Sequence, residues 1–276
     1  MPTQSELRMT YIGGPTLWMQ FGGLSLLTDP TFDAAGADFT TGPVTLSKIM
    51  GPALEPASLG CIDAVLLSHD HHFDNLDRTG RELLSRTAIV LTTQAGAARL
   101  GGNAKGLAPW EPIELTAPDG RVLRITATPA RHGPADGDRG PVIGFVLQFA
   151  DAPDEAIYVS GDTVWYEGVE EVLHRFPFIR VAVLFLGAAR IPIVPSHLTF
   201  SAQEAVRVAQ ALPDAVIVPV HYEGWKHFSE SRQDITQAFA DAGIADRLRW
   251  LPPGAIAQSV TTFSSESASA GVPHRG

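Results

Sequence analysis

The chain has 276 residues, of which 45% are hydrophobic and 18% are charged, so it can bury a large core in one domain or in two tightly fused halves. Its formal net charge of -10 argues against a nucleic-acid-binding surface, which needs clustered Lys and Arg, but allows an anionic substrate because a bound divalent cation can reverse the local field. The single cysteine, Cys61, excludes an internal disulfide framework and fits a reducing compartment.

The start of the chain and its apolar runs indicate a cytoplasmic protein. Residues 1–5 show no basic start followed by an apolar stretch, which a signal peptide would have. No apolar run reaches the ~20 residues that a membrane helix needs. We therefore expect neither export nor membrane insertion.

The first recognisable element is a hairpin. Residues 16–21 roughly alternate between apolar and polar, the chain turns at Gly22-Gly23, and residues 24–27 return as a second strand. Several later runs are continuously apolar, as expected for sheets that are covered on both faces. The strand-like runs cover residues 61–67, 88–92, 122–128, 142–149, 156–159, 181–186 and 215–220.

Helices alternate with these strands, which indicates an α/β fold of two sheets flanked by helices. Thr79-Gly80-Arg81-Glu82 and Ser201-Ala202-Gln203-Glu204 fit the capping-box pattern of a helix start. A third helix is predicted from about Asp234 to Asp241, with Gly243 as its stop. The chain has no repeats and no long linker, so we predict a single domain over residues 1–261. The tail over 262–276 is rich in Ser, Ala and Gly, which is typical of disorder.

The stretch from Ser68 to Asp77 is the most informative feature of the chain. It reads Ser-His-Asp-His-His-Phe-Asp-Asn-Leu-Asp and directly follows the apolar run 64–67. A hydrophilic surface loop explains it poorly, because only nine His occur in the chain and three of them are here. Imidazole and carboxylate ligands suit zinc, iron or manganese sites in which some positions stay open for water. The stretch therefore predicts a metal site.

Three further apolar runs end in the same way. Each is followed by a His or an Asp that stands close to Gly or Pro, the residues that turn a chain sharply. These residues are His132, Asp162 and His221. Because four of the predicted strands end in candidate ligands, we expect these ends to converge on one site.

These motifs, in this order, resemble the metallo-β-lactamase superfamily. Five separated motifs between about Thr10 and Ala257 carry the resemblance: Thr28-Asp29-Pro30, Ser68-His69-Asp70-His71, His132, Gly161-Asp162 and Pro219-Val220-His221-Tyr222. The opening Tyr11-Ile12-Gly13-Gly14 and the closing His221-Tyr222-Glu223-Gly224-Trp225 are similar to the branch of ascorbate-6-phosphate lactonase. The resemblance implies an αββα sandwich of two mixed β-sheets flanked by helices.

The resemblance also implies a centre of one or two divalent cations, with Zn²⁺ expected first and Mn²⁺ or Fe²⁺ as alternatives. The family's ligands match His69, His71 and His132 on the first cation, Asp162 as the bridging carboxylate, and His221 on the second cation. Asp29 matches a residue beside the site, which we expect to orient a ligating imidazole.

The chain departs from the family pattern His-x-His-x-Asp-His in its last two places. Counting from His69 puts Phe73 and Asp74 there, and a Phe cannot ligate. Counting backward from the end of the motif puts Asp74 and Asn75 there, with one extra residue in the loop, and we favour this alignment. Asp74 then serves the second cation, and Asn75 replaces the usual His. Either His72 fills the vacancy, or His72 is solvated and the second site is weakened or absent.

Two histidines outside these motifs have open roles. His197 stands just before a predicted helix, where it either lines the substrate pocket and acts as a proton donor or faces solvent. We place it with the catalytic residues. His227 either lines the pocket or packs beneath the site.

Together these features predict a metal-dependent hydrolase. A metal-bound hydroxide, oriented by Asp74 and Asp162, would attack the ester, lactone or phosphoester bond of a small substrate, including an anionic one. One alternative is a nuclease or phosphodiesterase of the same superfamily, although the acidic balance argues against it. A second is a one-metal iron oxygenase or a metal-binding protein without hydrolytic activity, which Asn75 keeps open. We expect a small-molecule substrate and no nucleic-acid or membrane partner, and the resemblance allows a homo-oligomer.

Overall fold

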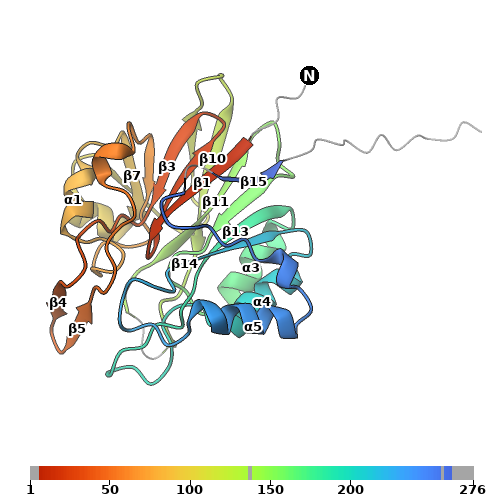
Figure 1. Ribbon diagram of the computed structural model, residues 1–276. Helices are drawn as coiled ribbons and strands as arrows, with labels where there is room; N and C mark the ends of the chain where they lie inside the picture. Colours follow the sequence, from red (N-terminus) through yellow and green to blue (C-terminus); the bar gives the residue numbers. More distant parts are fainter. Residues whose placement is uncertain (1–5, 136–138, 256–257, 263–276) are drawn as a thin grey trace, which may run out of the picture.

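The fold is built on two large mixed β-sheets (Figure 1). The computed structural model describes residues 6–135, 139–255 and 258–262 of the chain. Within them, the first sheet contains β1 (Glu6–Gly13), β2 (Thr16–Phe21), β3 (Leu24–Thr28), β6 (Ala64–Leu66), β7 (Ile89–Thr93), β8 (Ala104–Leu107) and β15 (Gln258–Thr262). Their order is β15-β1-β2-β3-β6-β7-β8. The pairs from β15 to β3 are antiparallel, and those from β3 to β8 are parallel.

The second sheet contains β9 (Pro112–Thr116), β10 (Val122–Pro129), β11 (Ile143–Phe149), β12 (Ala156–Val159), β13 (Ile179–Phe185) and β14 (Val216–Val220). Its order is β14-β13-β12-β11-β10-β9. The pairs from β9 to β12 are antiparallel, whereas β12, β13 and β14 run parallel. A separate hairpin of β4 (Asp38–Thr41) and β5 (Val44–Ser47) projects from the body of the molecule (Figure 1).

Helices flank each sheet. α1 (Arg78–Leu84) and α2 (Gln94–Leu100) accompany the first sheet, and α2 contacts β7 and β8. α3 (Glu167–Arg175), α4 (Ala202–Ala211) and α5 (Arg232–Asp241) gather on the side of the second sheet (Figure 1). Side chains of both sheets, such as Leu26 and Phe145, share one buried core. The predicted αββα sandwich is confirmed.

The predicted hairpin and strand runs are also confirmed. β2 pairs with β3 so that Phe21 lies opposite Leu24, and the two turn residues, Gly22 and Gly23, have φ angles of 58° and 83°. Such positive φ angles are what a two-residue hairpin turn requires. A Cβ at Gly22 would lie 2.3 Å from Cζ of Phe149, so the turn also packs closely on the second sheet.

One of the two predicted capping boxes is confirmed and the other is wrong. At the start of α4, Ser201 Oγ accepts a hydrogen bond from the Glu204 amide, and the Glu204 carboxylate accepts one from the Ser201 amide at 2.8 Å. Thr79 instead lies inside the first turn of α1. That helix is capped by Asp77, whose carboxylate accepts from the backbone amide three residues further on at 2.8 Å.

Other elements were not predicted, namely the β4–β5 hairpin, β1, β8, β9, β15, α2 and α3. The predicted disordered tail over 262–276 lies outside the described residues, except for Thr262, which ends β15. In the described part of the chain, no helix is long and apolar enough to cross a membrane.

Candidate metal centre

Four segments that follow β6, β10, β12 and β14 meet in one place. The segment after β6 is the histidine-rich stretch 68–77, and the other three carry His132, Asp162 and His221. Asp162 and His221 follow β12 and β14, which run parallel in one sheet and therefore end at the same edge. The predicted convergence is confirmed by three groups whose candidate ligand atoms lie within 4.8 Å of one another: His69, His71 and His72; His69, His132 and Asp162; and Asp74, Asp162 and His221.

Left-handed backbone conformations aim two of these side chains. Gly161, just before Asp162, has a φ of 58°, and a Cβ there would lie 2.6 Å from the carbonyl oxygen of Ile143. His221 itself has a φ of 55°, which is uncommon for a residue other than glycine. Its amide donates a hydrogen bond to the carbonyl oxygen of Gly14 at 2.7 Å. Backbone strain of this kind is concentrated at functional sites, where the surrounding structure maintains it.

The first cluster consists of three imidazoles. His72 Nδ1 lies 2.9 Å from His69 Nε2 and 3.1 Å from His132 Nε2. On the far side of its ring, His132 Nδ1 donates to the carbonyl oxygen of Leu198 at 2.9 Å. Because a carbonyl can only accept, this contact fixes the proton on Nδ1 and turns the lone pair of Nε2 toward the cluster.

The environment of this cluster favours neutral imidazoles. Burial lowers the pKa of His69 well below its usual value, and the neighbouring imidazoles lower it further. Burial and the charge of His132 lower the pKa of His72 to about 3. A metal ligand must be deprotonated, so both rings are in the required state at neutral pH.

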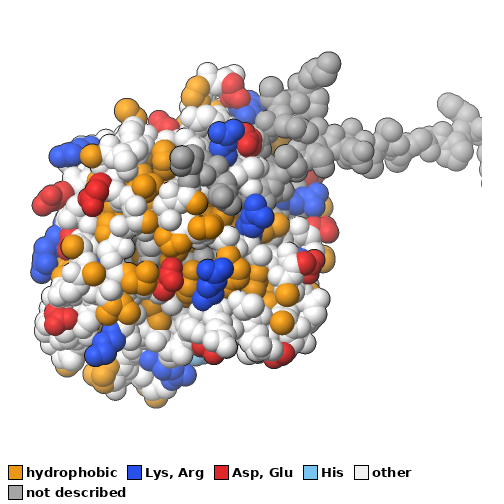
Figure 2. Space-filling model, in the orientation of Figure 1, with side chains coloured by type: hydrophobic (Ala, Val, Ile, Leu, Met, Phe, Trp, Pro, Cys, Tyr) orange, Lys and Arg blue, Asp and Glu red, His pale blue; other side chains and the backbone are white. Residues whose placement is uncertain are grey.

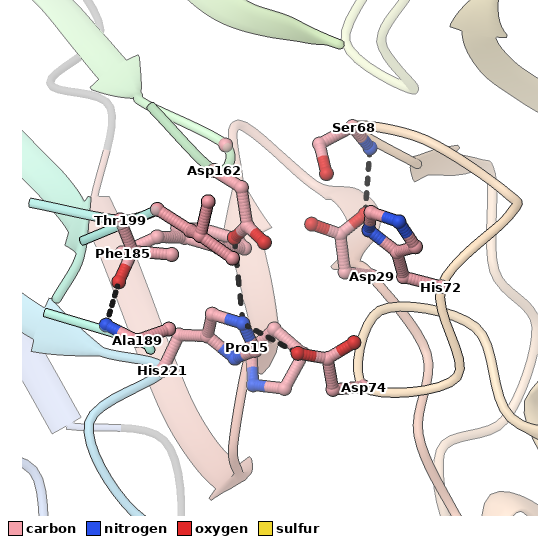
Figure 3. A network of polar contacts seen from close by, with 12 residues as sticks. Pro15, Asp29, Ser68, His72, Asp74, Asp162, Phe185, Ala189, Thr199 and His221 are labelled. Carbon is pink, nitrogen blue, oxygen red and sulfur yellow. Dashed lines mark hydrogen bonds and ion pairs between the residues drawn. The ribbon is translucent and has the colours of Figure 1, made fainter. Parts of the chain in front are cut away.

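Asp74, Asp162 and His221 form the second cluster. His221 Nε2 lies 3.4 Å from Asp162 Oδ1 and 3.6 Å from Asp74 Oδ2 (Figure 3). The other oxygen of Asp162, Oδ2, lies 3.5 Å from His132 Nε2 in the first cluster. Each oxygen of Asp162 therefore faces a different cluster. Burial raises the pKa of Asp162, but the charge of His221 and its contact with the carboxylate outweigh burial and hold the pKa below its usual value.

Several buried atoms of the second cluster lack hydrogen bonds. Among the described residues, neither oxygen of Asp162, neither ring nitrogen of His221 and not Oδ1 of Asp74 has a hydrogen-bond partner. Buried polar atoms without partners are rare because they cost free energy. Divalent cations would supply the missing partners, and a set of imidazoles and carboxylates suits Zn²⁺, Fe²⁺ or Mn²⁺. The residues present therefore fit the cations that the sequence implies.

Asp29 lies beside the clusters and acts on them through Ser68. Asp29 Oδ1 accepts a hydrogen bond from the Ser68 amide at 2.6 Å (Figure 3). Ser68 Oγ lies 2.9 Å from His69 Nδ1. The expected influence of Asp29 on an imidazole is therefore indirect. Burial and the charge of Asp162 raise the pKa of Asp29 well above its usual range, so positive charge at the centre would favour its ionised form.

The two adjacent histidines both lie at the first cluster. His71 forms a third candidate group with His69 and His72; its Nε2 donates to the carbonyl oxygen of Arg139 at 2.7 Å, which leaves its Nδ1 without a hydrogen-bond partner among the described residues. His72 has the short contacts with His69 and His132, because one extra residue in the loop shifts the second histidine of the motif. The suggestion that His72 fills the vacancy left by Asn75 is therefore corrected, since His72 joins the first cluster.

His227 is the residue that sequence reasoning undervalued. Its Nε2 lies 3.0 Å from Asp74 Oδ2, in the second cluster. Asn75, next to Asp74, is buried, and neither atom of its side-chain amide has a hydrogen-bond partner among the described residues. No strand end precedes His227, so its closeness in sequence to His221 was the only available signal.

His197 lies apart from both clusters. Its Nε2 lies 2.9 Å from Glu204 Oε2, and this contact raises the pKa of His197. It is absent from the lining of the pocket that reaches the clusters. The catalytic role predicted for His197 is therefore corrected, because its imidazole is paired with the capping carboxylate of α4.

A pocket opens onto the two clusters at His72, Asp74 and His132. Its open space, including the mouth to solvent, is about 460 Å³. Arg139 and His227 contribute polar atoms to the wall. The rest of the wall is mostly apolar and comes from Phe39, Val44, Leu46, Phe73, Ala189, Ile191 and Leu198.

Known proteins are similar to this chain in sequence and in fold. The UPF0173 protein YddR of Bacillus subtilis is 25% identical over 252 residues, which cover 88% of this chain and 96% of that protein. A UPF0173 metal-dependent hydrolase of Ignicoccus hospitalis is 25% identical over 257 residues, which cover 91% and 97%. The crystal structure of an isothiocyanate hydrolase from Delia radicum gut bacteria is similar in fold, with a TM-score of 0.76, 24% identity, and coverage of 93% of this chain and 100% of that one. A family model described as a beta-lactamase superfamily domain matches residues 25–222, which is more than half of the sequence. The chain thus belongs to the beta-lactamase superfamily.

Proposed function

We propose that the protein is a metal-dependent hydrolase whose substrate is a small molecule with an apolar body and an ester, lactone or phosphoester bond. The observation that carries this proposal is the position of Asp162, a buried residue whose two carboxylate oxygens face different clusters. Membership of the superfamily supports hydrolysis, as does the similarity to proteins named metal-dependent hydrolases.

The chain offers two sets of ligands that share Asp162. His69, His72 and His132 would hold one cation, with His71 in reach of His69 and His72, and Asp74 and His221 would hold the other. When bound, the cations supply Lewis acidity, which lowers the pKa of a water molecule and polarises the bond under attack. We expect Zn²⁺ first, and Mn²⁺ or Fe²⁺ suit the same ligands.

Two carboxylates are suited to orient the attacking water. Burial raises the pKa of Asp74, but the hydrogen bond and charge of His227 outweigh burial and hold that pKa below its usual value. His221 does the same for Asp162. Both side chains are therefore ionised at neutral pH and can accept hydrogen bonds from water. The Leu198 carbonyl keeps the lone pair of His132 turned toward the centre.

The pocket wall supports a substrate with an apolar body. The β4–β5 hairpin and the segment 189–198 supply most of the apolar side chains around the opening. Arg139 also lines the pocket, and its buried Nε has no hydrogen-bond partner among the described residues. A guanidinium in this position suits a carboxylate or another polar group of the substrate. The sequence resemblance makes lactones one substrate class to test. The similar fold of an isothiocyanate hydrolase makes isothiocyanates another.

The net charge and the face in Figure 2 give the nuclease alternative no support. The formal net charge is -10, and acidic and basic side chains are interspersed on the face in Figure 2, where they form no basic stripe. Phosphodiesters therefore enter the test as the competing substrate class.

The proposal is tested by hydrolysis under defined metal conditions. Protein purified without added ions is analysed for metal and then assayed with Zn²⁺ or Mn²⁺ against aryl esters, lactones, isothiocyanates and phosphodiesters. We expect turnover of an ester or lactone that a chelator abolishes. Asp162→Asn should lower kcat/KM by about 100-fold or more, because loss of even an indirect metal contact costs 10–100-fold. Asp154→Asn, at an exposed turn, should have no effect.

Three results would contradict the proposal: full activity after removal of metal, full activity of Asp162→Asn, or one iron per chain with oxygen uptake and no hydrolysis. The last result would favour the oxygenase alternative. Turnover confined to phosphodiesters would favour the phosphodiesterase.

A further inference from the structure

We propose that His227 supplies the imidazole that Asn75 cannot provide, so that it completes the ligand set of the second cation. That set would be Asp74, Asp162, His221 and His227. The inference rests on the proposed metal-dependent function and goes beyond it, because it assigns a ligand that lies outside the family pattern.

The first step is the vacancy. The family pattern places a histidine directly after the aspartate, but this chain has Asn75 after Asp74. An amide oxygen is a weaker ligand for zinc than an imidazole, and zinc sites are built mainly from nitrogen, sulfur and carboxylate ligands. Without another residue, the second cluster would offer one imidazole, from His221, and two carboxylates. His72 does not complete it, because its Nδ1 contacts the imidazoles of the first cluster.

The second step is the position of His227. Its Nε2 lies 3.0 Å from Oδ2 of Asp74, and Nε2 of His221 lies 3.6 Å from the same oxygen. Two imidazole nitrogens thus approach one carboxylate oxygen from different residues. Without a cation, Nε2 of His227 donates a hydrogen bond to this oxygen, and a bound cation would take the place of that proton. Ligand atoms that share a zinc ion lie about 2.0–2.2 Å from it, which places neighbouring ligands roughly 3–3.6 Å apart. Both distances at Asp74 Oδ2 have this spacing.

The third step is that the protein holds His227 in place. The carbonyl oxygen of His227 accepts a hydrogen bond from the Arg190 amide at 2.9 Å, and the amide of the preceding Lys226 donates to Ser47 at 3.0 Å. The ring packs against Phe228, with 4.7 Å between ring centroids. Its side chain is only 10% exposed, and its Nδ1 is buried without a hydrogen-bond partner among the described residues. A solvated surface histidine would have none of these features.

The same loop therefore provides both imidazoles of the second cluster. His221 begins the loop directly after β14, and His227 lies near its end, before the contacts of Ser229 with Gly187. In the family pattern, one of these two imidazoles comes from the histidine-rich stretch. In this chain, His227 of the loop after β14 would supply that imidazole instead.

The experiment measures stepwise metal binding rather than turnover. Chelator-treated protein is titrated with Zn²⁺ and with Co²⁺, whose visible absorption reports the ligand field of each site. We expect two ions per wild-type chain. His227→Ala should keep the first ion and weaken the second by more than about 100-fold, since a histidine that merely oriented Asp74 would cost only about 10–100-fold. His174→Ala, an exposed histidine in α3, is the matched control and should bind both ions normally.

A rescue variant separates ligation from packing. Adding Asn75→His to His227→Ala restores the histidine of the family pattern, so the second ion should return with its Co²⁺ spectrum. If circular dichroism shows that His227→Ala folds poorly, His227→Gln replaces it, because glutamine retains much of the side-chain volume. His227→Gln should also lose the second ion.

The inference is overturned if the wild-type chain binds only one ion, or if His227→Ala and His227→Gln both keep the second ion with unchanged affinity. In either case a chain that keeps its first ion and its hydrolytic activity leaves the proposed function intact. A wild-type chain that binds no ion at all would instead remove the proposed function.

Discussion

Replacing His72 with Ala tests which histidine of the adjacent pair binds metal. Its Nδ1 lies 2.9 Å from His69 Nε2 and 3.1 Å from His132 Nε2, so the variant removes one of the three ring nitrogens of the first cluster. Loss of a residue that only supports a ligand lowers metal affinity by about 10–100-fold, and loss of the ligand itself should exceed that range. We expect the first ion to bind more than about 100-fold more weakly, which corresponds to about 2.8 kcal/mol or more.

His71→Ala is the matched control, because it removes the same side chain one residue earlier. That variant loses a hydrogen bond from Nε2 to the carbonyl oxygen of Arg139 and ring contacts with His69 and His72, whereas His72→Ala also loses the contact with His132; His71→Ala should therefore weaken the first ion less than His72→Ala does. Both affinities are measured by competition with a chromophoric chelator, and thermal unfolding of the metal-free proteins checks that each variant folds. The reasoning would be refuted if His71→Ala lost the first ion while His72→Ala kept it.

Two other predictions concern stability. In chelator-treated protein, the free energy of unfolding should decrease as the pH falls below about 6.5. Burial lowers the pKa of His72 to about 3, so between about pH 6.5 and pH 3 this residue binds a proton in the unfolded chain but not in the folded one. Its contribution lowers the free energy of unfolding by up to about 2 kcal/mol at pH 5. Urea unfolding at pH 7 and pH 5 measures it, and His72→Ala should flatten the dependence. Lys48→Ala should lower the free energy of unfolding by about 3–5 kcal/mol at pH 7, because it leaves the buried carboxylate of Asp77 without its cation, 2.8 Å away. The exposed Lys105→Ala should change it by less than about 0.5 kcal/mol, and equal effects of the two variants would contradict the assignment.

The position of the site could be predicted from the sequence because its ligands follow strand ends. A continuous apolar run identifies a buried strand, and a His or Asp directly after it must lie at an edge of the sheet. His132, Asp162 and His221 all follow such runs, and the last two reach one edge because β12 and β14 both pair in parallel with β13, which lies between them. The αββα arrangement followed from the resemblance of the motifs and from the alternation of strands with helices.

The sequence could not decide which loop side chains face the centre. His71 and His72 are chemically identical neighbours, and the backbone path around one extra residue determines that His72 points to His132. His227 lies in a loop with no periodic pattern, so nothing in the sequence fixed its direction. The sequence also gives no sign that His197 is paired, because Glu204 fits a capping box, whereas in the structure its carboxylate also contacts His197 at 2.9 Å.

Asp77 connects the metal-binding loop with the wall of the pocket. Its Oδ1 caps α1, while its Oδ2 accepts hydrogen bonds from Lys48 Nζ at 2.8 Å and from the Asp33 amide at 2.6 Å. Lys48 directly follows β5, one strand of the hairpin that supplies apolar side chains to the pocket. The buried ion pair therefore fixes the hairpin relative to the loop that carries His69 and His72, but it contacts neither cluster. For this reason Lys48→Ala should raise KM for an apolar substrate while the metal content stays close to that of the unaltered protein. His72→Ala should instead lower the metal content.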